Sequence, residues 1–265
     1  MKLMKIVFLS VDDEYAGEMQ RPLFERHPEW ITGSIISSCR IYKKTNLEAA
    51  LFLLSHSGWS YVLSMIWTKL GSKIFSGSHA QTPLELARKH GVPAFFSSNI
   101  NDESSRQRLA GWNPDIVIST NFNHYVGGQA RKIARIGTWN LHKSYLPHYR
   151  GMAPGFYALL NGEKWSGATL HVMDAGFDTG DIIKQVKVPV QDGDTVFDLN
   201  FRISREGGNM LADLLDRLDP VNLAPENQSS GNWPTHSYPS RKDVQEFIRI
   251  GLKFDRLAGR RRNNA

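Results

Sequence analysis

The sequence predicts an α/β fold with a mostly parallel sheet, and three observations predict it. Short apolar runs alternate with helical patterns along the first half of the chain, turn-forming residues separate them, and a capped helix lies between two of the runs. The 265 residues, of which 41% are hydrophobic and 22% charged, are enough for one large domain with an appendage. We expect a Rossmann-like sheet followed by a short C-terminal extension.

Five apolar runs of the first half are predicted strands: Lys5–Ser10, Ile31–Ser38, Val92–Ser98, Asp115–Ser119 and Trp139–His142. A first helix is expected over about Tyr15–Arg26. A further helix begins at the capping box Thr82–Glu85, with proline at its first helical position, and ends at Gly91. The first strand–helix turn, Ser10–Gly17, has no glycine-rich dinucleotide fingerprint, which argues against a nicotinamide or ATP enzyme.

The segment Leu47–Phe75 is unusually apolar. From Ala49 to Trp67 it has no acidic or basic residue apart from His56, a length that approaches the roughly 20 residues of a membrane span. Ser55–Gly58 interrupts it, so we predict two short amphipathic helices. They would pack on the sheet edge or in a dimer contact, which is the favoured interpretation. The alternative is an interfacial element with aromatic residues at a membrane surface and flanking lysines, formed by Trp59, Tyr61, Trp67, Lys69 and Lys73.

The second half predicts a strand pair and two more helices. Ser166–Met173 and Asp181–Val190 alternate β-branched and polar residues, and a helix with an acidic first turn runs from Asp194 to about Leu218. Asp219–Tyr238 is rich in Pro, Asn, Ser and Gly, which predicts a linker. Ser240–Asp243 caps a last helix, Val244–Leu257, before a basic tail. We therefore expect a domain over residues 1–218, with the 47–75 insertion, and an extension over 219–265.

Asn140, His142 and Asp178 are the strongest candidates for chemistry. Asn140 and His142 are two residues apart on a predicted strand, so they point to one face at the strand's carboxyl end, where open α/β sheets bind ligands. An Asn amide can stabilise an oxyanion, a His can move a proton, and a carboxylate can orient the imidazole. The set suits acyl transfer to an amine. For any one of these residues alone, a role in holding a turn is the favoured interpretation, whereas the combination of three matched groups favours the functional one.

The motifs around these residues resemble the 10-formyltetrahydrofolate-dependent formyltransferase family. They are Asn140-x-His-x-Ser-x-Leu-Pro-x-Tyr-Arg-Gly151, Ala153-Pro154, Gly167-x-Thr-x-His171 and Asp178-Thr-Gly180. The resemblance is to sugar N-formyltransferases and to the catalytic domain of methionyl-tRNA formyltransferase. It implies catalysis by Asn140, His142 and Asp178, with Asp178 keeping His142 charged. It also implies that two loops hold the folate, through Phe122, Asn123, His124, Tyr125, Asp174, Gly176 and Phe177.

Six further residues are candidates for contact with the acceptor substrate: Ser10, Asp12, Asp13, Ser144, Arg150 and His171. By the resemblance, the first strand–helix turn faces this substrate, but its acidic residues would equally serve as helix caps. Arg150 would bind a phosphate or hold its own loop. His171 would line a pocket or form a structural hydrogen bond.

The resemblance implies formyl transfer from 10-formyltetrahydrofolate to a small primary amine or hydroxylamine, with a nucleotide-linked amino sugar as the leading acceptor. About 45 residues follow the helix that ends near Leu218, too few for the barrel with which methionyl-tRNA formyltransferases grip tRNA, so that alternative is weakened. Amino-acid or hydroxyornithine transfer, 10-formyltetrahydrofolate hydrolysis and a non-catalytic folate sensor remain open.

The remaining expectations concern the protein's environment. The single cysteine, Cys39, excludes an internal disulfide and a multi-thiolate metal site, and no histidine spacing matches a compact zinc pattern. The net charge of +6 suits an anionic folate or a phosphate-bearing substrate, and we expect no nucleic-acid partner. No signal peptide is visible, so we expect a cytoplasmic protein, with a homodimer as one open arrangement.

Overall fold

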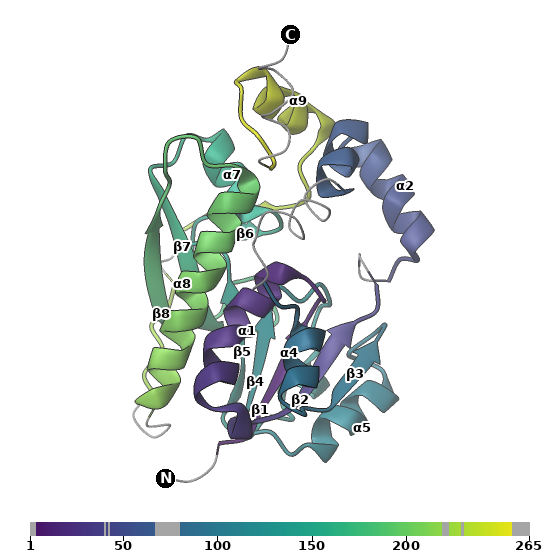
Figure 1. Ribbon diagram of the computed structural model, residues 1–265, viewed down its shortest axis with the longest axis vertical. Coiled ribbons are helices and arrows are strands. Elements are labelled where there is room, and N and C mark those ends of the chain that lie inside the picture. The colour runs from purple at the N-terminus through teal and green to yellow at the C-terminus, as the bar shows by residue number, and fades with distance from the viewer. Residues whose placement is uncertain are drawn as a thin grey trace.

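A seven-stranded sheet forms the centre of the molecule (Figure 1). The computed structural model describes residues 4–39, 41, 43–66, 80–218, 223–228 and 231–255. In the order in which they lie in the sheet, the strands are β3 (Ala94–Ser97), β2 (Ile31–Ser37), β1 (Ile6–Ser10), β4 (Ile116–Thr120), β5 (Gly137–His142), β7 (Trp165–Val172) and β8 (Ile182–Pro189). The first five are parallel, whereas β7 and β8 are antiparallel to their neighbours. The predicted mostly parallel α/β sheet is confirmed.

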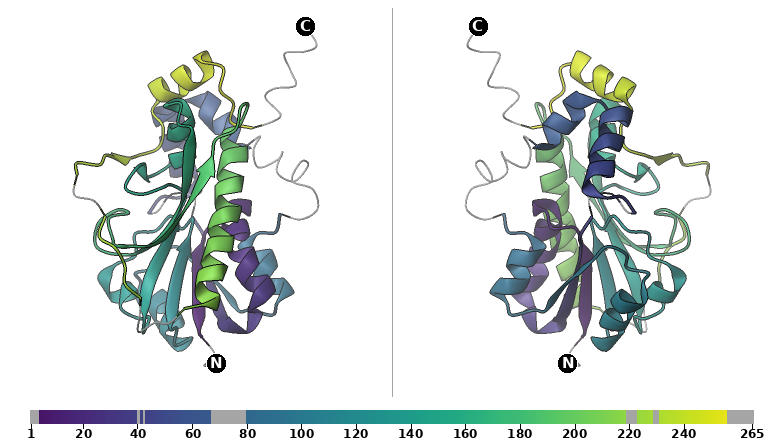
Figure 2. Two further views of the ribbon diagram at one scale, coloured as in Figure 1. Left: turned by 90° about the vertical axis from the view of Figure 1, so that its left-hand side faces the viewer. Right: turned by 90° about the vertical axis from the view of Figure 1, so that its right-hand side faces the viewer.

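Helices cover both faces of the sheet (Figures 1 and 2). Alternate residues of β1 point to opposite faces: Ile6 and Phe8 pack with α1 (Glu14–Arg26), α4 (Pro83–Lys89) and α8 (Val196–Asp216). Val7 and Leu9 pack on the other face with α5 (Glu103–Gly111) and α6 (Gly128–Arg131). Because both faces are covered, β1 and β4 are buried along their whole length and are apolar for most of it.

Capping boxes fix several helix starts. Thr82 caps α4 with Glu85, Thr195 caps α8 with Asp198, and Ser240 caps α9 (Arg241–Arg249) with Asp243. The last helix was predicted at Val244–Leu257, and both bounds were wrong. It begins three residues earlier because Asp243 is the third helical residue of the box, and it ends before Gly251, whose φ is +85°.

The apolar insertion forms two short helices, as predicted. They are α2 (Asn46–His56) and a helix over residues 59–66, separated at Gly58, where φ is +85°. Lys69, Lys73 and the rest of the insertion to Phe75 lie outside the described residues. Among the helices that the structure describes, none is long and apolar enough to cross a membrane.

The C-terminal segment packs back onto the preceding chain. Strand β9 (Thr235–His236) pairs in parallel with β6 (Arg150–Gly151), and Phe247 of α9 stacks on Phe156 of α7 (Pro154–Leu160) at a ring-centroid distance of 4.6 Å. The backbone N–H groups of the first two residues of α8 donate to the carbonyls of Lys253 and Phe254. The division into 1–218 and 219–265 therefore stays a prediction, and the basic tail beyond residue 255 lies outside the described residues.

Candidate active site

The carboxyl end of β5 brings three predicted catalytic residues together. Asn140 and His142 lie on one face of the strand, and the loop after β7 carries Asp178 up to them. The Asn140 amide nitrogen lies 3.1 Å from Asp178 Oδ1, and His142 Nδ1 lies 3.5 Å from Asp178 Oδ2. A fourth residue completes the group, because His171 of β7 is the cross-strand partner of Asn140.

The orientation of the Asn140 amide is determined by its neighbours. His171 Nδ1 donates to the carbonyl of Val172 at 2.9 Å, so in the neutral ring Nε2 is the acceptor. Asn140 Nδ2 donates to this Nε2 at 3.1 Å and to Asp178 Oδ1. A flipped amide would set its oxygen against a carboxylate and a lone pair. The two amide N–H groups are thus engaged before any substrate is bound.

His142 is buried between two acceptors. Its Nε2–H donates to the carbonyl of Tyr149 at 3.0 Å, which leaves Nδ1 as the nitrogen that gains a proton beside Asp178. Burial lowers the pKa of His142 below its usual value, although Asp178 and the Tyr149 carbonyl act in the opposite direction. Burial thus acts against the charged imidazole implied by the resemblance, and the role of Asp178 in keeping His142 charged stays a prediction.

Asp178 is held as a carboxylate in a strained position. Its φ of +55° lies in the left-handed region, and the Gly151 N–H donates to Oδ2 at 2.8 Å. Burial is the largest influence on the pKa of Asp178 and raises it, but the charge that His142 and His171 carry when protonated, together with the Gly151 N–H, holds it well below its usual range. The charge pair between Asp178 and a protonated His142 is thus ready to form.

Gln228 holds the loop that carries Asp178. Its side-chain amide donates to the carbonyls of Asp178 (2.9 Å) and Gly180 (2.8 Å), and its oxygen accepts from both Arg150 Nε (3.2 Å) and a terminal guanidinium nitrogen (2.6 Å). Our sequence analysis missed Gln228, which lies in a segment predicted as a linker with no helical or strand pattern. Arg150 was a candidate phosphate ligand, and here it contacts this side chain.

The two predicted folate loops meet beside Asp178. The Tyr125 hydroxyl donates to the carbonyl of Ala175 at 3.2 Å, and its ring lies edge-on to Phe177 at 5.9 Å. Phe177 is 62% exposed and Tyr125 38% exposed, so both rings offer apolar surface to a ligand. Asp174 accepts from the Gly176 N–H and from Thr179 Oγ1, which folds its loop into a tight turn.

The other predicted folate residues hold loops together in the structure. His124 Nδ1 accepts from the Ile100 N–H at 3.2 Å, and Nε2 contacts Ser37 Oγ at 2.8 Å. Burial lowers the pKa of His124 to about 4. Asn123 donates to the carbonyl of Cys39 at 2.6 Å, and Phe122 packs on the His124 ring.

The first strand–helix turn lies at the same sheet edge, across β4. Asp13 caps α1 through the Ala16 N–H at 2.8 Å and accepts from Asn121 at 2.6 Å. Asp12 accepts from the first turn of α4 through the Leu84 N–H, and Ser10 is fully buried. The two carboxylates thus act as helix caps in the structure, one of the two roles expected.

A lysine that sequence analysis did not single out lies beside this turn. Lys143 follows His142 directly, and its ammonium lies 4.6 Å from the centroid of the Tyr15 ring. Burial lowers the pKa of Lys143, while the charge of Asp13 raises it. Within the described residues, no carboxylate lies close enough to Lys143 for an ion pair. The Tyr15 ring also contacts Phe197 at the start of α8, at 5.7 Å.

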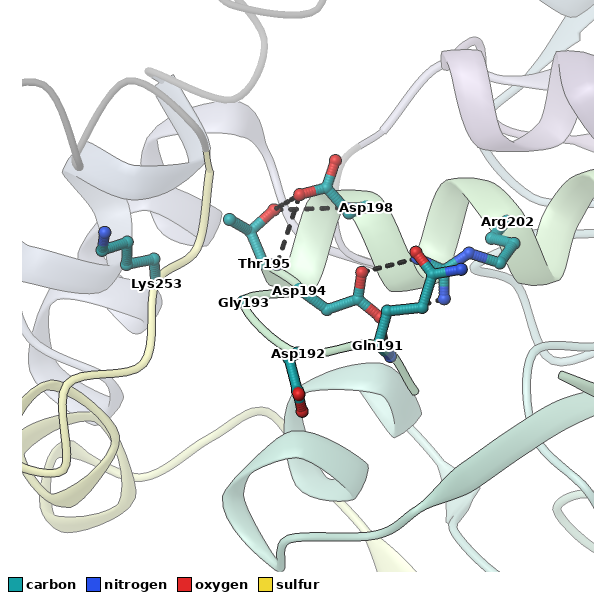
Figure 3. A pocket seen from close by; sticks show the side chains of 8 residues that line it. All are labelled: Gln191, Asp192, Gly193, Asp194, Thr195, Asp198, Arg202 and Lys253. Atoms are coloured by element: carbon teal, nitrogen blue, oxygen red, sulfur yellow. Dashed lines mark hydrogen bonds and ion pairs between the residues drawn. The ribbon is translucent and has the colours of Figure 1, made fainter. Parts of the chain in front are cut away.

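Two further features are a predicted substrate contact, Ser144, and a hollow at the start of α8. Ser144 is fully buried and donates to the carbonyl of His148 at 2.7 Å, so it holds its own loop. A hollow of about 350 Å³ lies at the start of α8 (Figure 3). Its acidic side chains are engaged in part: Asp194 with Arg202 at 2.5 Å, and Asp198 with Thr195 at 2.8 Å. Among the described residues, no group of His, Cys, Asp or Glu could hold a metal ion.

Comparisons with known proteins concern the chain's family and fold. The family described as Formyl transferase matches residues 44–215, which is more than half of the chain. A methionyl-tRNA formyltransferase of Ehrlichia ruminantium is 31% identical over 174 residues, or 65% of this chain and 57% of that protein. The chain thus spans little more than half the length of this relative.

Solved structures show the same fold. A glycinamide ribonucleotide transformylase 1 from Symbiobacterium toebii has a TM-score of 0.58 at 20% identity, covering 86% of this chain and 96% of that one. An N-formyltransferase from Helicobacter canadensis, in complex with folinic acid and dTDP-3-aminofucose, has a TM-score of 0.57 at 18% identity, covering 91% and 72%. At these identities the likeness concerns the fold alone.

Proposed function

Because this chain belongs to the formyl transferase family, we propose that it transfers a formyl group from 10-formyltetrahydrofolate to the primary amine of a small-molecule acceptor. The observation that carries the proposal is the convergence of Asn140, His142 and Asp178 at the carboxyl end of β5. Its groups match the needs of acyl transfer: a neutral hydrogen-bond donor for an oxyanion, an imidazole that can take up a proton, and a fixed carboxylate.

The proton path follows from the contacts of His142. When an amine adds to the formyl carbon, negative charge develops on the formyl oxygen and the amine must lose a proton. The neutral His142 takes this proton at Nδ1, and the imidazolium is stabilised by Asp178 Oδ2 and by the Tyr149 carbonyl. The same proton then passes to the departing nitrogen as the bond to the formyl carbon breaks, so the imidazole is neutral again after each turnover.

Asn140 supports the charge on the formyl oxygen. In the resting site its N–H groups donate to His171 and Asp178, so the formyl oxygen competes with one of these acceptors. Losing one such donor typically costs about a hundredfold to a thousandfold in rate. His171 is then a positioning residue, because it sets the plane of the Asn140 amide through Nε2.

The formyl donor suits the side of the site that carries the two predicted folate loops. 10-Formyltetrahydrofolate supplies the formyl group and an aromatic pterin ring. The exposed rings of Tyr125 and Phe177 suit contact with a flat heterocycle, and Phe177 directly precedes Asp178. The Helicobacter canadensis neighbour, whose complex contains folinic acid, supports this donor.

For the acceptor we propose an amino sugar on a nucleotide carrier. Lys143, beside His142, offers an ammonium to a phosphate, and the Tyr15 and Phe197 rings suit a base or sugar face. The dTDP-3-aminofucose of the neighbouring structure supports this class. Methionyl-tRNA is the second candidate, because the sequence relatives carry that name and the chain shares their motifs.

The test is a formyl-transfer assay with 10-formyltetrahydrofolate against a panel of amines, with the deformylated folate read by absorbance. The panel contains nucleotide-linked 3- and 4-amino sugars, hydroxyornithine, glycinamide ribonucleotide and methionyl-tRNA. Turnover that requires an amino sugar supports the proposal, whereas turnover that requires tRNA replaces the acceptor. Folate release without any amine would make the protein a hydrolase. Near-normal turnover by His142→Ala or Asp178→Ala would refute the proposed catalytic roles.

A further inference from the structure

The two helices of the insertion expose apolar side chains in a regular pattern. In α2, Leu47, Leu51 and Leu54 are exposed, and in residues 59–66 the exposed residues are Trp59, Leu63 and Ile66. Each set has the spacing i, i+4, i+7, which forms one stripe along a helix. We name these six side chains the apolar stripes. Leu47 is 70% exposed and Trp59 69% exposed.

The opposite faces of both helices are already occupied. Phe52 and His56 contact Tyr238, through an aromatic pair at 6.1 Å and a contact of 2.9 Å from His56 Nε2 to the Tyr238 carbonyl. Tyr61 meets Phe254 edge-on at 5.7 Å. The helices are therefore apolar on both sides, a pattern that indicates burial on both sides. Within the described residues, only the inner side is buried.

The stripes are unusually concentrated for a protein surface. Among the described residues, thirteen large hydrophobic side chains are exposed, and the stripes contain six of them within 20 residues. Two more, Ile248 and Ile250, lie at the end of α9, whose Arg241 donates to carbonyls near the end of α2. Figure 1 shows α9 and α2 side by side at one end of the molecule. Single exposed apolar residues are ordinary, but a gathered set marks an interaction surface.

The charges around α2 indicate what kind of partner the apolar stripes would bind. Lys43 and Lys44 precede α2, where the Lys44 ammonium lies over the Phe52 ring, and Arg241 donates to carbonyls at the carboxyl end of α2; Lys242 follows Arg241 in the sequence. The only acidic residue in residues 45–66 is Glu48, whose carboxylate accepts from the backbone and hydroxyl of Thr45. An apolar strip between basic ends complements a bilayer with anionic headgroups. A second copy of the chain fits less well, because a two-fold contact repeats the same basic ends on both partners.

We propose that α2 and residues 59–66 bind the surface of an anionic lipid bilayer, with the apolar stripes directed toward the acyl chains. The helices lie in the interface and do not cross it, because α2 has 11 residues and Gly58 separates it from the next helix. Trp59 suits the headgroup level, since its ring is apolar and its N–H is polar. The surface is separate from Asn140, His142 and Asp178 and does not depend on the proposed reaction.

The experiment is flotation of the purified full chain with vesicles of phosphatidylcholine alone or with phosphatidylserine added. We expect the chain to float with anionic vesicles and to release as salt increases. The triple variant Leu51→Gln, Trp59→Gln, Leu63→Gln should bind at least about tenfold more weakly. The matched control is Phe96→Gln on β3, which removes a side chain that is 52% exposed outside the stripes and should float like the wild type.

A second pair tests the charges. Lys242→Glu should weaken binding to anionic vesicles, whereas Lys132→Glu in the distant α6 region should not. Circular dichroism verifies that each variant is folded. The proposal is overturned if the wild-type protein does not float with anionic vesicles and stays at the bottom of the gradient. It is overturned as well if the triple variant floats as well as the wild type. It is also overturned if the stripes instead hold a dimer that the triple variant dissociates without any vesicle binding.

Discussion

Replacing Asp178 by Asn removes one charge from the centre of the proposed mechanism while keeping the shape of the side chain. The carboxylate lies 3.5 Å from His142 Nδ1, the atom that gains a proton during transfer. A unit charge pair about 4 Å apart is worth roughly 4 kcal/mol at an effective dielectric constant of about 20. If the transition state loses this interaction energy, kcat falls by about a thousandfold. The new amide also sets an N–H against the donor of Gly151 or Asn140.

The assay is steady-state formyl transfer at several pH values, with kcat and KM measured for donor and acceptor. We expect kcat to fall by about a thousandfold and either KM to change by less than about tenfold, because the charge pair forms only during the reaction. The pKa of His142 is already lowered by burial, and Asp178 is the main influence that raises it. Removal of the Asp178 charge therefore lowers the pKa of His142 further, and the acidic side of the pH profile of kcat moves to lower pH.

The control is Asp192→Asn, which makes the same chemical change on an exposed loop at the start of α8 and should leave kcat unchanged. The reasoning is refuted if Asp178→Asn keeps kcat within about tenfold of the wild type. An acid limb that does not move would contradict the assignment of His142 as the group that takes the proton.

Three further predictions follow from individual contacts. The contribution of His124 to the free energy of unfolding should fall by about 3 kcal/mol between pH 6.5 and about 4, because the unfolded His124 gains a proton across that window while the folded form, with a pKa of about 4, does not. Chemical denaturation of His124→Gln should therefore show a smaller dependence on pH. Gln228→Ala should lower kcat about tenfold, because it releases the loop that carries Asp178. The control, Gln107→Ala on the exposed face of α5, should have little effect on kcat. Equal kcat values in the two variants would show that the loop does not need Gln228. Lys143→Gln should raise the KM for a phosphate-bearing acceptor about tenfold, and it should raise the KM for an amine without a phosphate by less. The control, Lys187→Gln on β8, should leave both KM values unchanged.

The strands could be predicted because their signals are local. β1 and β4 are buried along their whole length and appear in the sequence as short, mainly apolar runs, and the capping box at Thr82 fixes a helix start through residues three apart. Helix α5 has no such pattern: its sequence is mostly polar, and only the cap at Asp102 marks its start. It was therefore missed.

The site could be predicted in part for the same reason. Asn140 and His142 share one strand, so their spacing alone places them together. The role of Gln228 depends on a contact across 50 residues of sequence, and the polar character of its segment gives no sign of it. The lowering of the His142 pKa also escaped prediction, because burial is a property of the packed chain and not of the neighbours of His142 in sequence.

Strand β5 pairs in parallel with β4 and antiparallel with β7, and Asn140 of β5 lies opposite His171 of β7. The register between β7 and β8 shifts between Leu170 and His171, next to this pair. Successive side chains of a strand face opposite ways, so a slip of β7 by one residue would set Leu170 or Val172 opposite Asn140. Such a chain would keep its sheet and most of its core and still lose the acceptor that orients the amide. Insertions and deletions around this irregularity are therefore changes through which a descendant of this protein could stay folded and become inactive.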